Sequence, residues 1–243
     1  MYEIVPHEFR DKKLYFTQVG TTDLYNHFMT FCLERDVREE WWDIKEGDVV
    51  IDVGAGHGAY SLTAMAVGAA LVLAFEPSKE EGFALTNNSI VNSWLDRILL
   101  VPMLLGESTQ LVRYLPPVTG LGVLEKLRWF PHWFRKMFKA KQRREEARFM
   151  VTLDTFLGRY GVPKLDWIKI DVEGMELDVL KGASGTIKQF RPRLLIENHV
   201  GYVPSIDLAI REFFAPLGYC EENRTGVGIN DNWSRWTPNE KVI

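Results

Sequence analysis

Two consecutive parts of the sequence carry residue types suited to binding a nucleoside. The run DVGAGHG at residues 52–58 follows a β-branched segment. Its three glycines, Gly54, Gly56 and Gly58, let the backbone approach a ligand closely and leave helix N–H groups free to bind it. Glu76 ends the next apolar run, where an acid can accept hydrogen bonds from both hydroxyls of a ribose. These features predict a nucleoside-bearing cofactor.

The glycine spacing is compatible with two cofactors. Gly54, Gly56 and Ala59 match G-x-G-x-x-A, the pattern of NAD sites, which is a weak signal by itself. Asp52 and Gly58 extend it to D-x-G-x-G-x-G, which resembles the S-adenosylmethionine (SAM) site of Rossmann-like methyltransferases. The chain also lacks a clear second domain, which dehydrogenases usually need for their substrate. We therefore predict SAM, with Asp52 among its binding residues. An NAD-dependent oxidoreductase and a non-catalytic nucleoside-binding module are the alternatives.

A later segment resembles one methyltransferase family more closely. The run IDVEGME at 170–176, followed by VLKGA at 179–183, is similar to the IDVEG-x-E-x-x-VL-x-G pattern of the FkbM-type family. The resemblance covers about residues 48–105 and 150–200. It implies a Rossmann-like class I methyltransferase that transfers a methyl group from SAM, commonly to a hydroxyl of a sugar or natural product. Supporting runs in the same order are IDVGAGHG at 51–58, FEPS at 75–78, NN at 87–88, TLD at 152–154 and IENH at 196–199.

From the NN run we take Asn88 as a further contact to the cofactor. The sequence departs from the family at the strand end LLG, residues 104–106, where we expect small or polar contacts to adenine. It also carries a long basic insertion. These two departures leave open which residues contact adenine and which acceptor is bound.

Methyl transfer to an alcohol requires alignment and a group that takes the hydroxyl proton. Lys169, Asp171 and Glu173 alternate along one strand end and share a face if the strand continues. His199 follows the next apolar run and is the base best matched to neutral pH. We expect Asp171 to orient the cofactor or the acceptor. Glu173 and His199 are candidates for the base or for holding the substrate, and the buried Lys169 needs one of the acids as its partner.

A metal-dependent mechanism is an alternative. Catechol O-methyltransferase-like enzymes place acidic and amide ligands at comparable strand ends. Asp171, Glu197 and Asn198 would offer Mg²⁺ the oxygen ligands that it prefers.

The elements that must position these residues follow from the apolar pattern. Repeated β–α units predict an α/β domain whose mostly parallel, seven-stranded sheet has helices on both faces and binds ligands at the carboxyl ends of its strands. Ser78 with Glu81 forms a capping box for one helix. The tail, around residues 226–236, suits antiparallel closing strands. The runs taken as parallel strands are 49–53, 71–75, 98–105, 167–171 and 194–197.

The chain divides into an N-terminal helical segment at 1–47 and a SAM-binding domain at 48–243. Thr22 can begin a helix in the first segment. The domain contains a basic, aromatic insertion at about 110–148. We consider it a lid over the acceptor, plain packing on the domain, or a peripheral membrane contact through 125–148.

Composition limits the functions that remain. The protein has 243 residues, 46% hydrophobic and 26% charged, with a net charge of −4. Residues 125–148 hold nine Lys or Arg and three Asp or Glu, which gives +6 and leaves −10 for the remainder. This acidity argues against nucleic acid as the partner and favours a small-molecule or glycan acceptor. The charged N-terminal segment lacks the apolar core of a signal peptide, so we expect a cytoplasmic protein.

Overall fold

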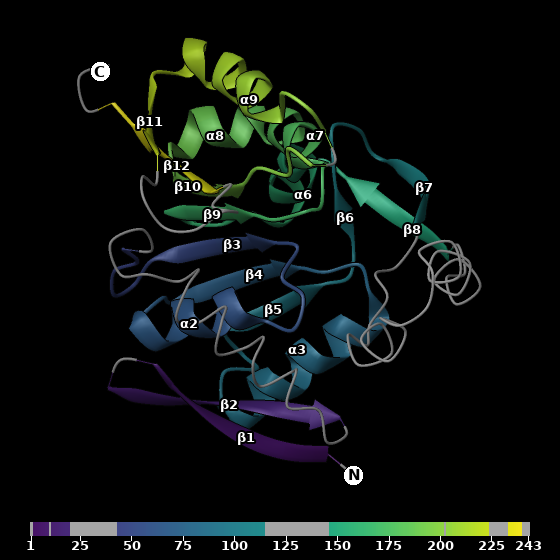
Figure 1. The fold of residues 1–243 in the computed structure, drawn as a ribbon, viewed down its shortest axis with the longest axis vertical. Helices are drawn as coiled ribbons and strands as arrows, with labels where there is room; N and C mark the ends of the chain where they lie inside the picture. The colour runs from purple at the N-terminus through teal and green to yellow at the C-terminus, as the bar shows by residue number, and fades with distance from the viewer. Residues whose placement is uncertain are drawn as a thin grey trace, which may run out of the picture.

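The computed structural model describes residues 2–9, 11–19, 43–114, 146–201, 203–223 and 233–239. A seven-stranded sheet forms the centre of the molecule (Figure 1). Its strands run in the order β11-β12-β10-β9-β3-β4-β5, and neighbours are parallel from β10 to β5. β12 is antiparallel to both β10 and β11. The mostly parallel sheet and the antiparallel closing strands are therefore confirmed. The strands are β3 (Val49–Val53), β4 (Leu71–Phe75), β5 (Ile98–Val101), β9 (Trp167–Ile170), β10 (Arg193–Glu197), β11 (Tyr219–Asn223) and β12 (Trp233–Pro238).

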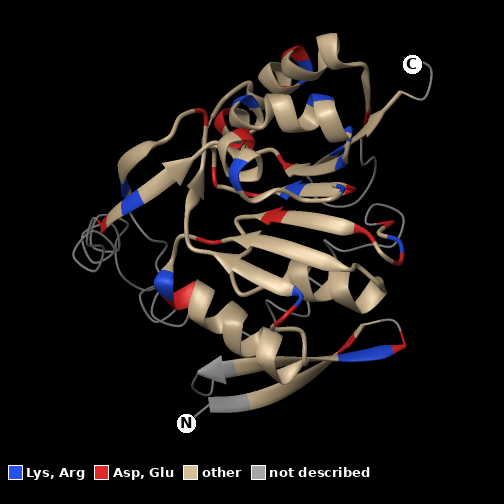
Figure 2. Ribbon diagram, turned by 180° about the vertical axis from the view of Figure 1, so that it is seen from behind, with Lys and Arg blue, Asp and Glu red and all other residues tan. Residues whose placement is uncertain are grey.

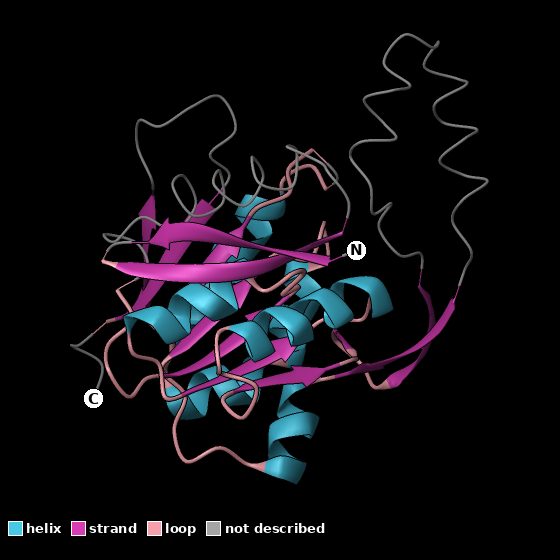
Figure 3. Cartoon of the chain, turned by 90° about the horizontal axis from the view of Figure 1, so that it is seen from below, coloured by secondary structure: helices cyan, strands magenta, loops and turns pink. Residues whose placement is uncertain are grey.

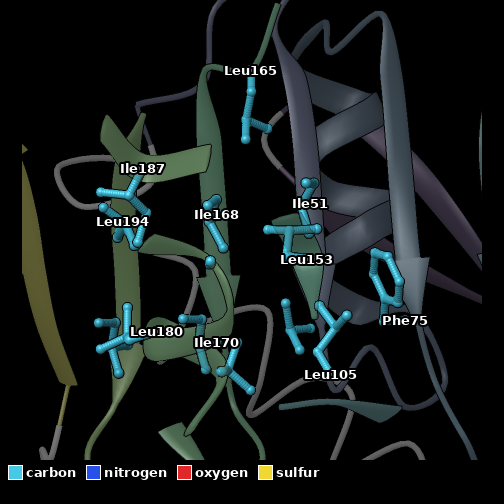
Figure 4. Close-up of a cluster of buried hydrophobic side chains, with 14 of the residues drawn as sticks. Ile51, Phe75, Leu105, Leu153, Leu165, Ile168, Ile170, Leu180, Ile187 and Leu194 are labelled. Carbon is cyan, nitrogen blue, oxygen red and sulfur yellow. The ribbon is translucent and has the colours of Figure 1, made fainter. Parts of the chain in front are cut away.

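Helices cover both faces of the sheet, so each central strand is buried on two sides. Val50 packs into one hydrophobic cluster, with α2 and part of α3, whereas Ile51 packs into the other, with α6 to α9. Ile51, Ile168 and Leu194 lie on neighbouring strands in the second cluster (Figure 4). This burial on both faces explains the continuous apolar runs. The helices are α2 (Ala59–Val67), α3 (Lys79–Val91), α6 (Leu153–Tyr160), α7 (Glu176–Gly182), α8 (Ser184–Phe190), α9 (Ile206–Phe214) and the short 3₁₀ helix η2 (Ala215–Leu217).

Local signals in the sequence set the start of two helices that lead away from strand ends. The Ser78 hydroxyl accepts a hydrogen bond from the Glu81 N–H at 3.3 Å, which confirms Ser78 as the cap of α3. The other half of the predicted capping box is not formed, because the Ser78 N–H donates to Glu76 rather than to Glu81. Thr152 caps α6 in the same way through the Thr155 N–H, at 3.0 Å.

The N-terminal segment differs from the prediction. Residues 2–19 form an antiparallel hairpin of β1 (Tyr2–Phe9) and β2 (Lys12–Val19) rather than helical structure. The reason is a period of two along β2: Leu14 and Phe16 are fully buried, whereas Lys13 and Tyr15 are exposed. The hairpin lies beside α2 and α3 (Figures 1 and 3). The helix expected from Thr22 lies outside the described residues.

The insertion begins and ends in a small second sheet. β6 (Leu104–Leu105), β8 (Glu146–Val151) and β7 (Gln110–Tyr114) form three strands in that order. β7 and β8 are antiparallel and extend away from the central sheet (Figure 3). The run expected as one strand at 98–105 is two, β5 and β6, because Pro102 interrupts it. Residues 115–145 lie outside the described residues, so the lid and membrane-contact hypotheses stay predictions. Among the described residues, no helix is long and apolar enough to cross a membrane.

Candidate active site

The residues selected from the sequence gather at one edge of the central sheet. The parallel strands β3, β4, β9 and β10 all end there, and Asp52 of β3 lies opposite Lys169 of β9. Asp171 and Glu173 continue from β9, and His199 follows β10. The parallel register therefore brings together residues that are far apart in the sequence.

Each of the three positions requires a glycine for a different structural reason. All have positive φ, at +73° for Gly54, +53° for Gly56 and +93° for Gly58. A Cβ on Gly54 would lie 1.8 Å from the carbonyl oxygen of Asp171, so this glycine allows two strand ends to approach. A Cβ on Gly58 would meet the Leu85 side chain of α3 at 3.1 Å. At Gly56 a Cβ would meet no atom of the described residues within 4 Å, so this is the glycine at which the backbone is open to a ligand.

Glu76 connects the end of β4 to the glycine loop. Its carboxylate accepts hydrogen bonds from the Gly56 N–H at 2.9 Å and the Ser78 N–H at 2.7 Å. Burial raises its pKa, and these two hydrogen bonds oppose the rise. Next to it is an open cavity of about 450 Å³. The cavity is lined by Glu76, Pro77, Ser78, Lys79, Gly82, Phe83, Thr86, Leu100, Pro102 and Arg148.

The open glycine and the buried acid fit a cofactor that carries a ribose. The carboxylate has the acceptor oxygens that two ribose hydroxyls require, and the apolar part of the neighbouring cavity suits a base. The glycine loop and Glu76 are thus the residues that would hold SAM.

Lys169 and Asp52 lie beneath this loop. The Lys169 ammonium donates to the Gly54 carbonyl at 2.8 Å and is 3.2 Å from Asp52 and 3.5 Å from Asp171. Burial by itself would lower the pKa of Lys169, but Asp52 and Asp171 outweigh it and the pKa is raised. The second oxygen of Asp52 accepts from the Ser61 hydroxyl at 2.7 Å. Because both side chains are buried, we interpret them as positioning residues rather than reacting or cofactor-contacting groups.

Lys169→Met should destabilise the protein by about 3–5 kcal/mol, because it leaves the Asp52 carboxylate buried without its cation. Urea unfolding followed by circular dichroism measures the loss. Lys188→Met, on the exposed side of α8, is the matched control and should stay within about 0.5 kcal/mol of wild type. A loss below 1 kcal/mol in the Lys169 variant would contradict the role assigned to this ion pair.

His199 is surrounded by carboxylates. Its Nδ1 lies 2.7 Å from Oε1 of the fully buried Glu176. Its Nε2 lies 3.6 Å from Glu173, 3.8 Å from Asp171 and 3.9 Å from Glu197. Burial opposes the charged imidazolium, but the hydrogen bond to Glu176 and the charges of Glu197 and Asp171 raise its pKa to about 9. His199 is therefore protonated, and carries a positive charge, at neutral pH.

The turn after β9 presents Glu173 and is fixed by Glu176. Glu173 has φ +56° and Gly174 has φ +106°, so a non-glycine residue occupies the left-handed region. The Gly174 N–H donates to Glu176 Oε1 at 2.9 Å, which fixes the turn to the same oxygen that contacts His199. Glu173 itself is 70% exposed. Backbone strain of this kind is common where a side chain must be presented to a ligand.

Asn88 has a different surrounding from the one we expected. Its oxygen accepts from the N–H and the hydroxyl of Thr17, at 2.7 and 2.8 Å, and its amide donates to the His57 carbonyl at 2.8 Å. The side chain is fully buried between the hairpin and the glycine loop. We therefore interpret Asn88 as a support for the loop.

The magnesium alternative does not fit the geometry. Asn198 exchanges hydrogen bonds with the Ser234 hydroxyl, at 3.2 and 3.4 Å, rather than joining Asp171 and Glu197. One atom each of Asp171, Glu173 and His199 lies within 4.8 Å of the others, but this set offers an imidazole nitrogen in place of one of the oxygen ligands that Mg²⁺ prefers.

Three parts of this site were not predicted from the sequence. Glu176 was not among the predicted site residues, although its carboxylate orients His199. Glu81 approaches Glu76, and burial with this charge raises its pKa to about 8. Arg148 of the insertion reaches the cavity. The motif IDVEG-x-E, which spans Glu176, contained a signal for the first; the other two depend on tertiary contacts.

Stability should fall as pH rises from 6.5 to 9.5. Glu81 and Glu197, whose pKa values burial raises to about 8, bind protons more tightly in the folded protein, so their ionisation is a cost of folding at high pH. The contribution of His199 is complete below pH 6.5 and is lost as pH rises through 9. We expect a melting temperature lower by about 5 °C at pH 9.5, measured by scanning calorimetry. A constant or rising melting temperature would contradict these assignments.

The sheet order, the glycine loop and the acid at the end of β4 define a Rossmann-like class I methyltransferase. A family model described as the methyltransferase FkbM domain matches residues 52–220, well over half of the chain. The protein therefore belongs to the FkbM methyltransferase family. This match favours methyl transfer over the oxidoreductase alternative.

Comparison with solved structures agrees with this fold. Methyltransferase FkbM from Methylobacillus flagellatus KT is 17% identical, with a TM-score of 0.53 over 86% of this chain and 52% of that one. The chain thus spans about half the length of that structure. A 16S rRNA methyltransferase from T. thermophilus, solved with AdoMet and guanosine, is 13% identical with a TM-score of 0.48, over 98% of this chain and 51% of that one. Precorrin 8w decarboxylase from Methanobacterium thermoautotrophicum is 14% identical with a TM-score of 0.46, over 91% and 93%. No curated protein matches the chain.

Proposed function

We propose that this protein transfers a methyl group from SAM to a hydroxyl of a saccharide, glycan or natural product. The observation that carries the proposal is the His199 cluster, which lies at the same sheet edge as the open glycine and Glu76. A cofactor site alone would serve any methyltransferase. A buried proton-handling cluster beside it is what a hydroxyl acceptor requires, because the acceptor must lose its proton as the new bond forms.

SAM, when bound, supplies a methyl group that is already activated, so the task of the chain is to hold and align its partner. Gly56 and Glu76 bind the ribose. His199, protonated at neutral pH, donates a hydrogen bond to the acceptor and holds it. Glu173, exposed and 3.6 Å from His199, takes the hydroxyl proton, and Asp171 orients the acceptor or the cofactor amino group.

An assay for labelled methyl transfer tests the proposal. The full chain is first tested for binding of S-adenosylhomocysteine by calorimetry. It is then incubated with SAM carrying a labelled methyl group and with saccharides, natural products and, separately, RNA. We expect label on a hydroxyl of a saccharide or natural product. Label on RNA or on an amine would overturn the acceptor class, and failure to bind S-adenosylhomocysteine would overturn the cofactor. Binding without any transfer would support the non-catalytic alternative.

Two further assignments remain proposals. One is a cytoplasmic location, and the other is a small acceptor rather than nucleic acid, which the acidic remainder of the chain supports.

A further inference from the structure

The hairpin β7–β8 is attached to the segment that carries the cofactor acid. Arg148 of β8 donates from Nε to the Pro77 carbonyl at 2.9 Å and pairs with Glu146. Its side chain is only 13% exposed, and its guanidinium lies 5.9 Å from the ring centre of Tyr114. Lys79, at the start of α3, is 3.8 Å from Glu146 and adds a weaker link. Charges of both signs meet where α3 begins (Figure 2).

Pro77 stands between the acid and one of the residues that fix it. Glu76 precedes it, and the N–H of Ser78 after it donates to the Glu76 carboxylate at 2.7 Å. A guanidinium that holds the Pro77 carbonyl therefore holds the turn that orients Glu76. Among the described residues of the insertion, Arg148 also lines the cavity beside Glu76.

The two faces of the hairpin β7–β8 differ in how far their side chains are buried. Tyr114 and Arg148 are partly buried on the face toward α3, and burial with the nearby charges of Glu76 and Glu81 raises the pKa of Tyr114. Leu111 and Phe149, paired across the strands, are 61% and 62% exposed on the other face. The contact with the cofactor edge is thus specific to one face.

We propose that Arg148 is a positioning residue through which the hairpin at the base of the insertion holds Glu76 in its ribose-binding orientation. The inference rests on the proposed function, because Glu76 must bind the ribose. Coupling between two sites is reciprocal, so cofactor binding stabilises the attachment of the hairpin to the same extent. Attachment of the hairpin at the base of the insertion and binding of the cofactor are therefore energetically coupled.

Calorimetry with S-adenosylhomocysteine tests the link. We expect Arg148→Ala to raise Kd about tenfold while kcat at saturating SAM stays within about threefold of wild type, as for the loss of one charged hydrogen bond. Arg148→Lys should recover part of the affinity, because an ammonium can reach one acceptor but cannot bridge Pro77 and Glu146 as a planar fork does. Arg113→Ala, on the exposed face of the hairpin, is the matched control and should bind as wild type does.

Hydrogen exchange supplies a second readout that a purely structural role would not change. S-adenosylhomocysteine should slow exchange in residues 146–151 of wild type, and this protection should be lost in Arg148→Ala and reduced in Arg148→Lys. The lysine variant keeps the charge and is the one to compare with wild type if the alanine variant does not fold. Unchanged Kd in both variants, or equal protection in wild type and variant, overturns the inference alone. Wild type that fails to bind S-adenosylhomocysteine overturns the proposed function and the inference with it.

Discussion

Glu76→Ala should weaken binding of S-adenosylhomocysteine about 100-fold, because it removes a carboxylate that accepts hydrogen bonds from both ribose hydroxyls. The loss of affinity is larger than that expected for Arg148→Ala, because the Glu76 carboxylate itself contacts the ribose. In the structure it also organises the Gly56 and Ser78 N–H groups. Isothermal titration calorimetry measures the change.

The same substitution should leave the fold intact. Burial raises the pKa of Glu76, so its charge is a cost to the folded protein. Of the two residues whose N–H groups its removal frees, Ser78 lines an open cavity that water can enter and Gly56 is partly exposed. Glu80→Ala, an exposed acid one turn further on, is the matched control and should not change Kd. A Kd for Glu76→Ala within threefold of wild type would show that the ribose binds elsewhere.

The central fold was accessible from the sequence because its signals are local. The β-branched run at 49–53 is buried on both faces, and Ser78 caps α3 as its spacing with Glu81 indicates. The N-terminal hairpin was missed because the alternation along residues 12–19 covers a single strand, which cannot show its partner. Pro102 in the run 98–105 did carry a signal for the break between β5 and β6.

The candidate site likewise has one part that local sequence signals predict and another that depends on contacts between distant segments. Gly54, Gly56 and Glu76 follow from a motif whose spacing encodes one loop and the next strand end. The His199 cluster depends on the pairing of β9 with β10, which joins residues distant in the sequence. Asn88, which we expect among the cofactor contacts, hydrogen-bonds Thr17 of the hairpin that was not predicted. The parts of the fold and of the site that the sequence did not show therefore have a common physical origin in contacts between remote segments.

His199→Gln should lower kcat by about 10²- to 10³-fold while Kd for S-adenosylhomocysteine stays within about threefold of wild type. The imidazolium holds the acceptor, whereas the ribose is held by Gly56 and Glu76. Steady-state rates with an acceptor found by the labelling assay, together with calorimetry, separate the two effects. A large change in Kd with little change in kcat would place His199 in the cofactor site.

The pH profile shows in which protonation state His199 acts. If the imidazolium holds the acceptor, the wild-type rate falls as pH rises above about 9, the pKa to which Glu176, Glu197 and Asp171 raise this histidine. Glu176→Gln keeps the shape of its side chain but removes the charge 2.7 Å from Nδ1, so the descending limb should shift to lower pH. A positioning role without charge would lower kcat and leave that limb in place. A wild-type rate that keeps rising above pH 9 would instead make His199 the base and leave Glu173 to hold the acceptor, because a base must be unprotonated to take the hydroxyl proton.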